Sequence, residues 1–345
     1  MKALTLTAIG GLEHLKLQEL PKPSLTSPDQ VLVRIRAAAL NRIDLWVVEG
    51  LPGEGPSFPH VVGSDGAGVV EEVGAQVWQV RPGDRVMLNP GLSCGRCAAC
   101  LESEESLCGS YRILGEHVGG TLAEYVVVPA VNLAPVPAAM SWSQAAGFSL
   151  ATLTAWRMLT TRARLRAGET ALIWGSGGGV SQAALQIAVL IGARAIVTGG
   201  TEAKLETARR LGAAETILHS QTDVVSEVRR MTGGRGADVV VDSVGERTWP
   251  NSLRALRRGG RLVICGATTG PSASFDLRRL FWHQWSILGS TMGSRREYAE
   301  IVRLAHQGKL VPVVDEVVRL DEGPTAFERM QRGEQSGKLV IEVSP

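Results

Sequence analysis

The chain has 345 residues, of which 36 are Lys or Arg and 34 are Asp or Glu, so its formal net charge is +2. This length predicts two domains, and the near-neutral charge without a basic block argues against a nucleic-acid or anionic-membrane partner. No apolar run approaches the roughly 18 residues that cross a bilayer. Residues 1–5 lead into a strand-like run without a signal peptide, so we expect a cytoplasmic protein with a small-molecule partner.

The first third of the chain predicts a compact β-rich domain. Apolar or alternating runs bounded by Gly, Pro or Asp are expected to form strands at residues 31–37, 67–73, 85–88 and 125–128. We assign this domain to residues 1–150.

From about residue 150 the pattern changes to apolar runs that alternate with helical periodicity. Helices are predicted at residues 181–191 and 202–211, each ending near a glycine that suits a C-terminal cap. Continuous apolar runs between them are typical of buried parallel strands, predicted at 171–174, 195–198, 239–242 and 262–265. The expected fold is therefore α/β, with a doubly wound parallel sheet over residues 151–290.

The remaining segment, residues 291–345, predicts a helix at 297–306 and strands at 313–320 and 338–342. Its pattern is similar to that of the opening domain. We therefore expect the tail to return to that domain.

A glycine cluster at residues 174–180 directly follows a predicted strand and opens a helix. Glycines let the backbone approach a pyrophosphate, and a helix N-terminus offers free N–H groups with a partial positive charge. A tight strand-to-helix turn would look similar, but the strand, helix and second strand together favour a Rossmann-type dinucleotide site. The expected contacts are Gly177, Gly178, Gly179 and Val180.

The end of the second strand bears on the choice between NAD and NADP. An acidic residue there would bind the ribose 2′-hydroxyl of NAD, but this chain has Gly199 and Gly200. Thr201 could donate a hydrogen bond to a 2′-phosphate, and Lys204 could add a charge-assisted one. The alternative is that Thr201 is a helix N-cap and Lys204 an exposed lysine. We expect NADP(H), with NAD(H) as the alternative.

Four of the five cysteines, Cys94, Cys97, Cys100 and Cys108, lie in one short segment. Their spacing suits a tetrahedral zinc with four thiolate ligands and no open position. Two disulfides would be unusual in a cytosolic enzyme, and an iron–sulfur cluster would favour a shorter final spacing. We predict one structural zinc per chain, in a lobe of about residues 91–112.

Together these features resemble the zinc-containing alcohol dehydrogenase and quinone oxidoreductase branches of the medium-chain dehydrogenase/reductase family. The resemblance extends to residues 39–44, 58–68, 83–86, 120–125 and 259–263. It implies a GroES-like β-barrel catalytic domain beside the Rossmann domain. It also implies contacts with the nicotinamide from Thr154, Val244, Gly266 and Ala267.

In alcohol dehydrogenases of this family, three residues hold a catalytic zinc. The matching positions here are Asn41, Ser64 and Leu150, and none offers a thiolate, imidazole or carboxylate. Ile43 likewise replaces the family's proton-relay hydroxyl. The segment Asn41-Arg42-Ile43-Asp44 resembles the Asn-x-x-Asp sequence of zinc-free quinone oxidoreductases and enone reductases, although those relatives commonly lack a four-cysteine lobe.

We therefore expect hydride transfer from NAD(P)H to a quinone or activated enone without catalytic zinc. Asn41, Asp44 and Trp46 are the candidate catalytic residues, with the Asn41 amide as hydrogen-bond donor to the acceptor oxygen and Trp46 as an apolar wall. The alternative for Asn41 and Asp44 is that they satisfy backbone groups at a strand-to-helix turn.

Two other functions stay open. One is a zinc-type alcohol or aldehyde dehydrogenase with an atypical metal site formed by residues such as His60, Asp65 and Asp44. The other is a dinucleotide-binding sensor without turnover. Residues 285–292 resemble the edge strand through which family members pair, which predicts a homodimer or homotetramer. An internal strand is the alternative.

Overall fold

The computed structural model describes residues 1–53 and 55–344. The chain forms two units, one made of Met1–Ala151 and Gly293–Pro345 and the other of Thr152–Met292. Within the described ranges, no helix combines the length and apolar character needed to span a membrane.

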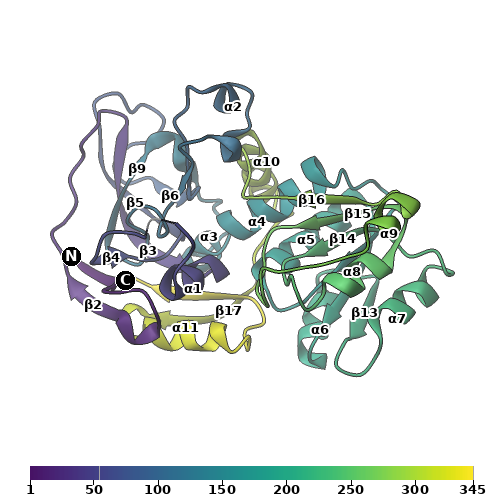
Figure 1. The fold of residues 1–345 in the computed structure, drawn as a ribbon. Coiled ribbons are helices and arrows are strands. Elements are labelled where there is room, and N and C mark those ends of the chain that lie inside the picture. Colours follow the sequence, from purple (N-terminus) through teal and green to yellow (C-terminus); the bar gives the residue numbers. More distant parts are fainter. Residues whose placement is uncertain (54, 345) are drawn as a thin grey trace. The chain divides into compact units, whose positions relative to one another are not determined.

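The first unit is built mainly on antiparallel strand pairs. Its seven-stranded sheet has the order β10-β6-β5-β3-β18-β17, and β9 also pairs with β3 (Figure 1). The strands are β3 (Gln30–Ala39), β5 (Asp65–Val73), β6 (Arg85–Leu88), β9 (Tyr125–Pro129), β10 (Leu133–Pro135), β17 (Val314–Arg319) and β18 (Lys338–Glu342). The smaller sheets comprise β1 (Lys2–Leu6), β2 (Leu15–Glu19) and β4 (His60–Val61), and β7 (Gly91–Leu92) with β8 (Arg112–Ile113).

The helices of this unit are α1 (Arg42–Glu49), α2 (Ala98–Leu101), α3 (Trp142–Ala146), α10 (Arg295–His306) and α11 (Gly323–Gln331). Strand β18, near the C-terminus, pairs with β3 and places Val340 opposite Ala39. The C-terminal segment thus contributes strands to a sheet begun some 300 residues earlier in the chain.

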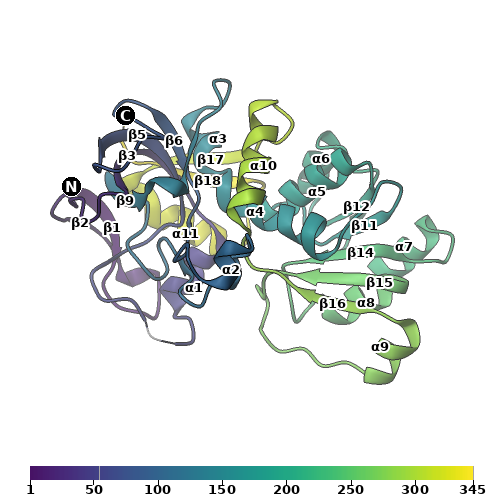
Figure 2. The same ribbon diagram turned by 90° about the horizontal axis from the view of Figure 1, so that it is seen from above.

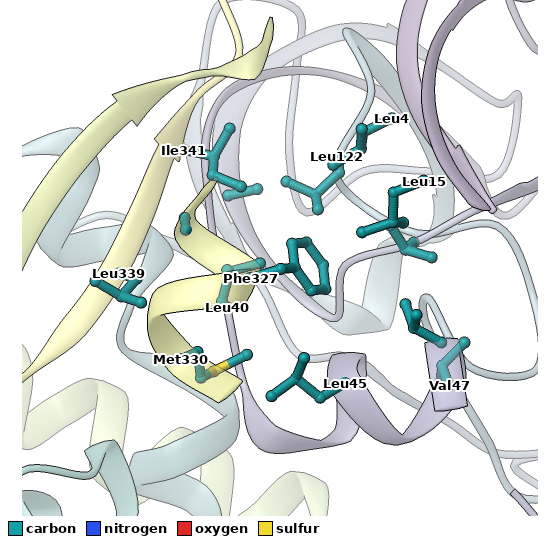
Figure 3. Packing of buried hydrophobic residues seen from close by; sticks show 14 of the residues in the cluster. Leu4, Leu15, Leu40, Leu45, Val47, Leu122, Phe327, Met330, Leu339 and Ile341 are labelled. Atoms are coloured by element: carbon teal, nitrogen blue, oxygen red, sulfur yellow. The ribbon is translucent and has the colours of Figure 1, made fainter. Parts of the chain in front are cut away.

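The tail also completes the apolar core of the first unit. Buried side chains of α11 recur at a spacing of three to four residues, which gives the helix one apolar face. Phe327 on this face is fully buried. Figure 3 shows its ring directed towards Leu15 and Leu122, with Met330 of the same helix and Ile341 of β18 nearby.

The second unit contains a six-stranded parallel sheet with the order β13-β12-β11-β14-β15-β16. Its strands are β11 (Thr170–Ile173), β12 (Arg194–Gly199), β13 (Glu215–Leu218), β14 (Ala237–Asp242), β15 (Leu256–Ile264) and β16 (Ser286–Gly289). Helices cover both faces (Figure 2), namely α5 (Gly179–Ile191), α6 (Glu202–Arg210), α7 (Val224–Met231) and α8 (Trp249–Ala255). A further helix, α9 (Leu277–His283), lies in the connection before β16. Helix α4 (Ser149–Trp156), followed by a π-helical turn at Arg157–Arg162, leads into this unit.

The predicted doubly wound α/β fold is confirmed. Every residue of β11 and β14 is buried, as continuous apolar runs in the sequence indicate. Helix α5 ends at Gly192, whose φ of 84° is the left-handed conformation that suits a glycine cap. The strand order reverses between β11 and β14, which is where open parallel sheets bind ligands.

Candidate active site and zinc lobe

The glycine loop between β11 and α5 has the form expected of a phosphate-binding loop. Gly178 is the N-cap of the 13-residue helix α5, so the predicted contact residues Gly177, Gly179 and Val180 lie at its N-terminus. The first N–H groups of a helix have no partner within the helix and favour an anion. Ser181, at the position of a third glycine, donates its hydroxyl to the Gly178 carbonyl at 2.9 Å.

The other candidate cofactor contacts follow the carboxyl ends of parallel strands. Strand β12 ends at Gly199, β14 at Asp242 and β15 at Ile264. Parallel strands end at the same edge of a sheet, so the residues that follow these strands lie at the same edge as the glycine loop. They are Gly199, Gly200, Thr201, Lys204, Val244, Gly266 and Ala267. Thr154 lies on α4, where its hydroxyl donates to the Met292 sulfur at 3.8 Å.

Two glycines, Gly199 and Gly200, stand at the end of β12, and a side chain at the first of them would crowd its neighbours. A Cβ atom on Gly199 would lie 2.6 Å from Leu205 Cδ2 and 2.7 Å from Ser176 Oγ. The Ser176 hydroxyl is buried, and no described protein group is hydrogen-bonded to it. The glycine at position 199 therefore lets Leu205 and Ser176 pack closely against the end of the strand.

The alternative for Thr201 is confirmed, because its Oγ1 caps α6 by accepting from the Lys204 backbone N–H at 3.4 Å. The hydroxyl hydrogen is not used in this contact. Sequence reasoning missed His219, whose Nε2 lies 3.5 Å from the position of a Cβ on Gly200. Partial burial and the Lys204 charge lower the pKa of His219. This end of the sheet therefore gathers a hydroxyl, an ammonium and an imidazole.

The four cysteines of the zinc lobe have the geometry of a tetrahedral metal site. Their sulfur atoms all lie within 4.8 Å of one another, and the Cys97–Cys100 and Cys94–Cys108 pairs are 3.5 and 3.6 Å apart. A tetrahedral zinc with bonds of about 2.3 Å spaces its sulfur ligands about 3.8 Å apart. The donor set thus fits structural zinc, and none of the described cysteines forms a disulfide.

A second cluster occupies the positions matched to the family's catalytic zinc. We name Asn41, Asp44, Ser64, Asp65 and Lys338 the polar corner, and all five are buried. Lys338 Nζ donates to Asn41 Oδ1 at 2.7 Å and lies 3.1 Å from Asp65 Oδ2. The Asn41 amide donates to the same Asp65 oxygen at 2.9 Å. The Ser64 hydroxyl donates to Asp44 Oδ1 at 2.8 Å.

These contacts test whether a catalytic zinc fits. The Asn41 oxygen and the Ser64 hydroxyl are engaged with protein groups, and Leu150 contributes only its backbone N–H, which donates to Asp65 Oδ1 at 2.8 Å. The three positions therefore do not fit a zinc ion.

The residues suggested for an atypical metal site do not form one. His60 Nε2 is hydrogen-bonded to the Gly115 carbonyl at 2.9 Å, which is a structural use of the ring. Over residues 1–53 and 55–344, the four cysteines are the one group of His, Cys, Asp or Glu side chains placed to hold a metal. His60, Asp65 and Asp44 are thus not brought together as ligands.

The Asn41 and Asp44 side chains are hydrogen-bonded to other groups of the protein. Asp44 Oδ2 accepts from the Asn41 backbone N–H at 2.7 Å at the start of α1, which is the backbone role weighed as the alternative. The donors of the Asn41 amide are directed to Asp65 and to the Ala39 carbonyl. Trp46 is partly exposed on α1. Lys338 was not predicted from the sequence. The one sequence feature that could have indicated it is a lysine at the start of an otherwise apolar strand.

Comparisons with known proteins agree with this architecture. Family models match residues 27–138 as an alcohol dehydrogenase GroES-like domain and residues 179–307 as a zinc-binding dehydrogenase. An NAD-dependent alcohol dehydrogenase of Sulfolobus acidocaldarius is 33% identical, with both chains covered completely. A quinone oxidoreductase of Mus musculus is 27% identical over 99% of this chain and 97% of its own. A crystal structure of an NAD-dependent alcohol dehydrogenase has a TM-score of 0.96 and 45% identity, with both chains fully covered.

These findings correct one expectation and confirm another. The expected zinc-free reduction of a quinone or enone is wrong, because full-length relatives with 32–33% identity, higher than that of the quinone oxidoreductase, are NAD-dependent alcohol dehydrogenases, and solved structures similar to this chain are alcohol dehydrogenases too. The expected oxidoreductase class, with its GroES-like and Rossmann parts, is confirmed. The chain therefore belongs to the medium-chain, zinc-type alcohol dehydrogenase family.

Proposed function

We propose that the protein is a nicotinamide-dependent oxidoreductase that interconverts an alcohol and the corresponding aldehyde or ketone. The similarity to NAD-dependent alcohol dehydrogenases over the full length of the chain carries this proposal. In the oxidation direction, the alcohol carbon gives a hydride to the oxidised nicotinamide and the hydroxyl group loses a proton. The products are a carbonyl compound, the reduced cofactor and one proton.

The cofactor is proposed to lie along the carboxyl edge of the parallel sheet. The N-terminus of α5 would hold the pyrophosphate, and Thr154, Val244, Gly266 and Ala267 would surround the nicotinamide end. Asn41 and Asp44 are proposed to shape the start of α1, and Trp46 to provide an apolar contact for the substrate. A structural zinc is proposed at the four cysteines, whose spacing suits it.

We infer that the preferred cofactor is NADP(H). Because residues 199 and 200 are both glycines, no carboxylate stands at the end of β12 to repel a 2′-phosphate. Lys204 and His219 face the same strand end as the Thr201 hydroxyl, and all three can donate hydrogen bonds to phosphate oxygens. NAD(H) would lack the group that these donors recognise.

A homodimer formed through β16 is proposed as the assembly. Strand β16 lies at the edge of the six-stranded sheet, which contradicts the alternative of an internal strand. Helix α9 precedes it, and Leu277, Phe281 and Trp282 on this helix are 66%, 67% and 66% exposed. An open strand edge beside exposed apolar side chains favours pairing with a second copy.

Initial rates with primary and secondary alcohols and NADP⁺ or NAD⁺, and with aldehydes and ketones and the reduced cofactors, test the activity. We expect alcohol-dependent reduction of NADP⁺. Quinones and enones serve as comparison substrates. Tight cofactor binding without turnover of any alcohol, aldehyde or ketone would contradict the proposal and favour a dinucleotide sensor.

A matched pair of variants ties this activity to the glycine loop. A Cβ on Gly178 would meet only Ser181 Oγ, at 3.5 Å, so a side chain is tolerated there. Gly178→Asp puts a negative charge at the N-terminus of α5 and should abolish cofactor binding, whereas Gly178→Ala should retain most of it. Equal cofactor affinities in the two variants would show that the pyrophosphate binds elsewhere.

A further inference from the structure

The zinc lobe is attached to the first residue of α10. Arg295 donates its backbone N–H to Glu105 Oε2 at 3.2 Å, and its guanidinium donates to Ser93 Oγ at 3.1 Å. Ser93 directly precedes Cys94, and Glu105 lies three residues before Cys108. Arg295 therefore contacts both ends of the segment that holds the metal ligands, and Figures 1 and 2 show α2 of this lobe beside α10.

The lobe exposes large apolar side chains, so its order is expected to come from the metal. Leu101 and Leu107, two large apolar side chains within it, are 75% and 68% exposed. A segment of this kind is held by the bonds to zinc, and the free energy of metal binding then serves as folding free energy. Loss of the metal should release the two contacts with Arg295.

Helix α10 carries the contact into the interior of the first unit. One turn after Arg295, the hydroxyl of the buried Tyr298 is hydrogen-bonded to Ser149 Oγ at 2.9 Å. Ser149 begins α4, and the next residue, Leu150, donates its backbone N–H to Asp65 Oδ1 at 2.8 Å. The Asp65 carboxylate accepts hydrogen bonds from Lys338 and Asn41 in the polar corner.

We propose that Arg295 and Tyr298 are positioning residues through which the zinc lobe fixes Asp65 and hence the polar corner. Glu105, Tyr298, Ser149 and Asp65 are each less than a tenth exposed. Buried polar groups are costly to leave without partners, so each link constrains the next. In this way the zinc affects the position of Asp65, which is not one of its ligands. The inference rests on the structural zinc of the proposed function but not on the proposed substrate.

Hydrogen–deuterium exchange of the full chain, with zinc bound and after its removal by a chelator, tests the coupling. Metal analysis before and after establishes the zinc content. We expect amides in the first turn of α10 and the Leu150 amide to exchange about tenfold faster without zinc, a change of about 1.4 kcal/mol in their opening free energy. Helix α11, which packs on the core around Phe327, serves as the internal reference and should be unchanged.

Single substitutions that leave the zinc ligands unchanged test each hydrogen bond between the lobe and Asp65 in turn. Glu105→Ala should accelerate exchange both in α10 and at Leu150, and chelation should then add less at Leu150 than in the wild type, because only the Ser93 contact is left to release. Glu105→Gln retains an acceptor oxygen and should restore the wild-type pattern. Tyr298→Phe removes one hydroxyl and should affect Leu150 while leaving the first turn of α10 as in the wild type.

Two results would overturn the inference. Faster exchange confined to the lobe would show that α10 does not depend on it. Equal acceleration in α11 would show that zinc acts only on the stability of the whole unit. Exchange is measured without substrate, so failure of the protein to oxidise any alcohol would leave this result intact.

Discussion

Asp44 is a carboxyl group enclosed entirely by the protein, with an exposed fraction of 0%. Burial raises its pKa from 3.8 to about 7, against the opposing effect of hydrogen bonds from the Asn41 backbone and the Ser64 hydroxyl. The folded state therefore binds a proton more tightly at this site than the unfolded state does. Its contribution to stability is present below about pH 4 and is lost as the pH rises towards 7.

The variant Asp44→Asn mimics the protonated side chain and should remove this pH dependence. Between pH 5 and pH 7, the wild type is expected to lose up to about 1.4 kcal/mol of unfolding free energy per pH unit relative to Asp44→Asn. Urea unfolding at several pH values measures the difference. Asp321→Asn, at an exposed position, should follow the wild type. Parallel curves for the wild type and Asp44→Asn would refute the assignment.

His219 offers a second test at the residue scale. Its pKa is lowered in the free protein, so the ring is uncharged near neutral pH and becomes a cation on acidification. The variant His219→Gln should raise the KM for NADPH roughly fivefold, about 1 kcal/mol, and leave the KM for NADH unchanged. The wild-type preference for NADPH should grow as the pH falls below 6.5, where the ring begins to take up a proton. His306→Gln, on α10, is the control, and an unchanged KM for NADPH in His219→Gln would exclude this contact.

Among the elements, α11 shows how much the first unit depends on its tail. Phe327 fills the space between this helix and the strands of the first unit (Figure 3). Phe327→Ala should lower the unfolding free energy of this unit by about 3–5 kcal/mol, because it removes apolar contacts and leaves a cavity. Chemical denaturation followed by circular dichroism measures the loss. The exposed Val317→Ala should cost far less, and a similar cost for both would contradict this view of the core.

At the scale of the whole molecule, the exposed side chains of α9 predict assembly. Light scattering should give twice the 36.7 kDa of one chain. The double variant Phe281→Asp and Trp282→Asp should shift the protein towards the mass of a single chain, because it places charges on the apolar surface next to β16. Trp78→Asp is the matched control, since Trp78 is 84% exposed in the first unit. A wild type with the mass of one chain would rule out the dimer.

Features encoded over short distances could be predicted from the sequence. The apolar runs of β11 and β14, the glycine loop before α5 and the four-cysteine lobe each depend on residues within about 15 positions of one another. Helix α9 was not predicted, because none of its residues is buried and seven residues are too few to establish a helical period. The irregular pairing that carries β15 through Gly259 and Gly260 also escaped prediction, since glycines usually mark turns.

The sequence by itself determined the two kinds of sheet, the place of the dinucleotide loop and the zinc lobe, because periodicity and spacing act locally. Only the tertiary structure decided which groups pair with the buried charges of the polar corner. Lys338 and Asn41 are 297 positions apart, and their contact exists because β18 joins the sheet beside β3. The same holds for Tyr298 with Ser149 and for His219 with Gly200, since these neighbours are set by helix packing and strand order rather than by chain proximity.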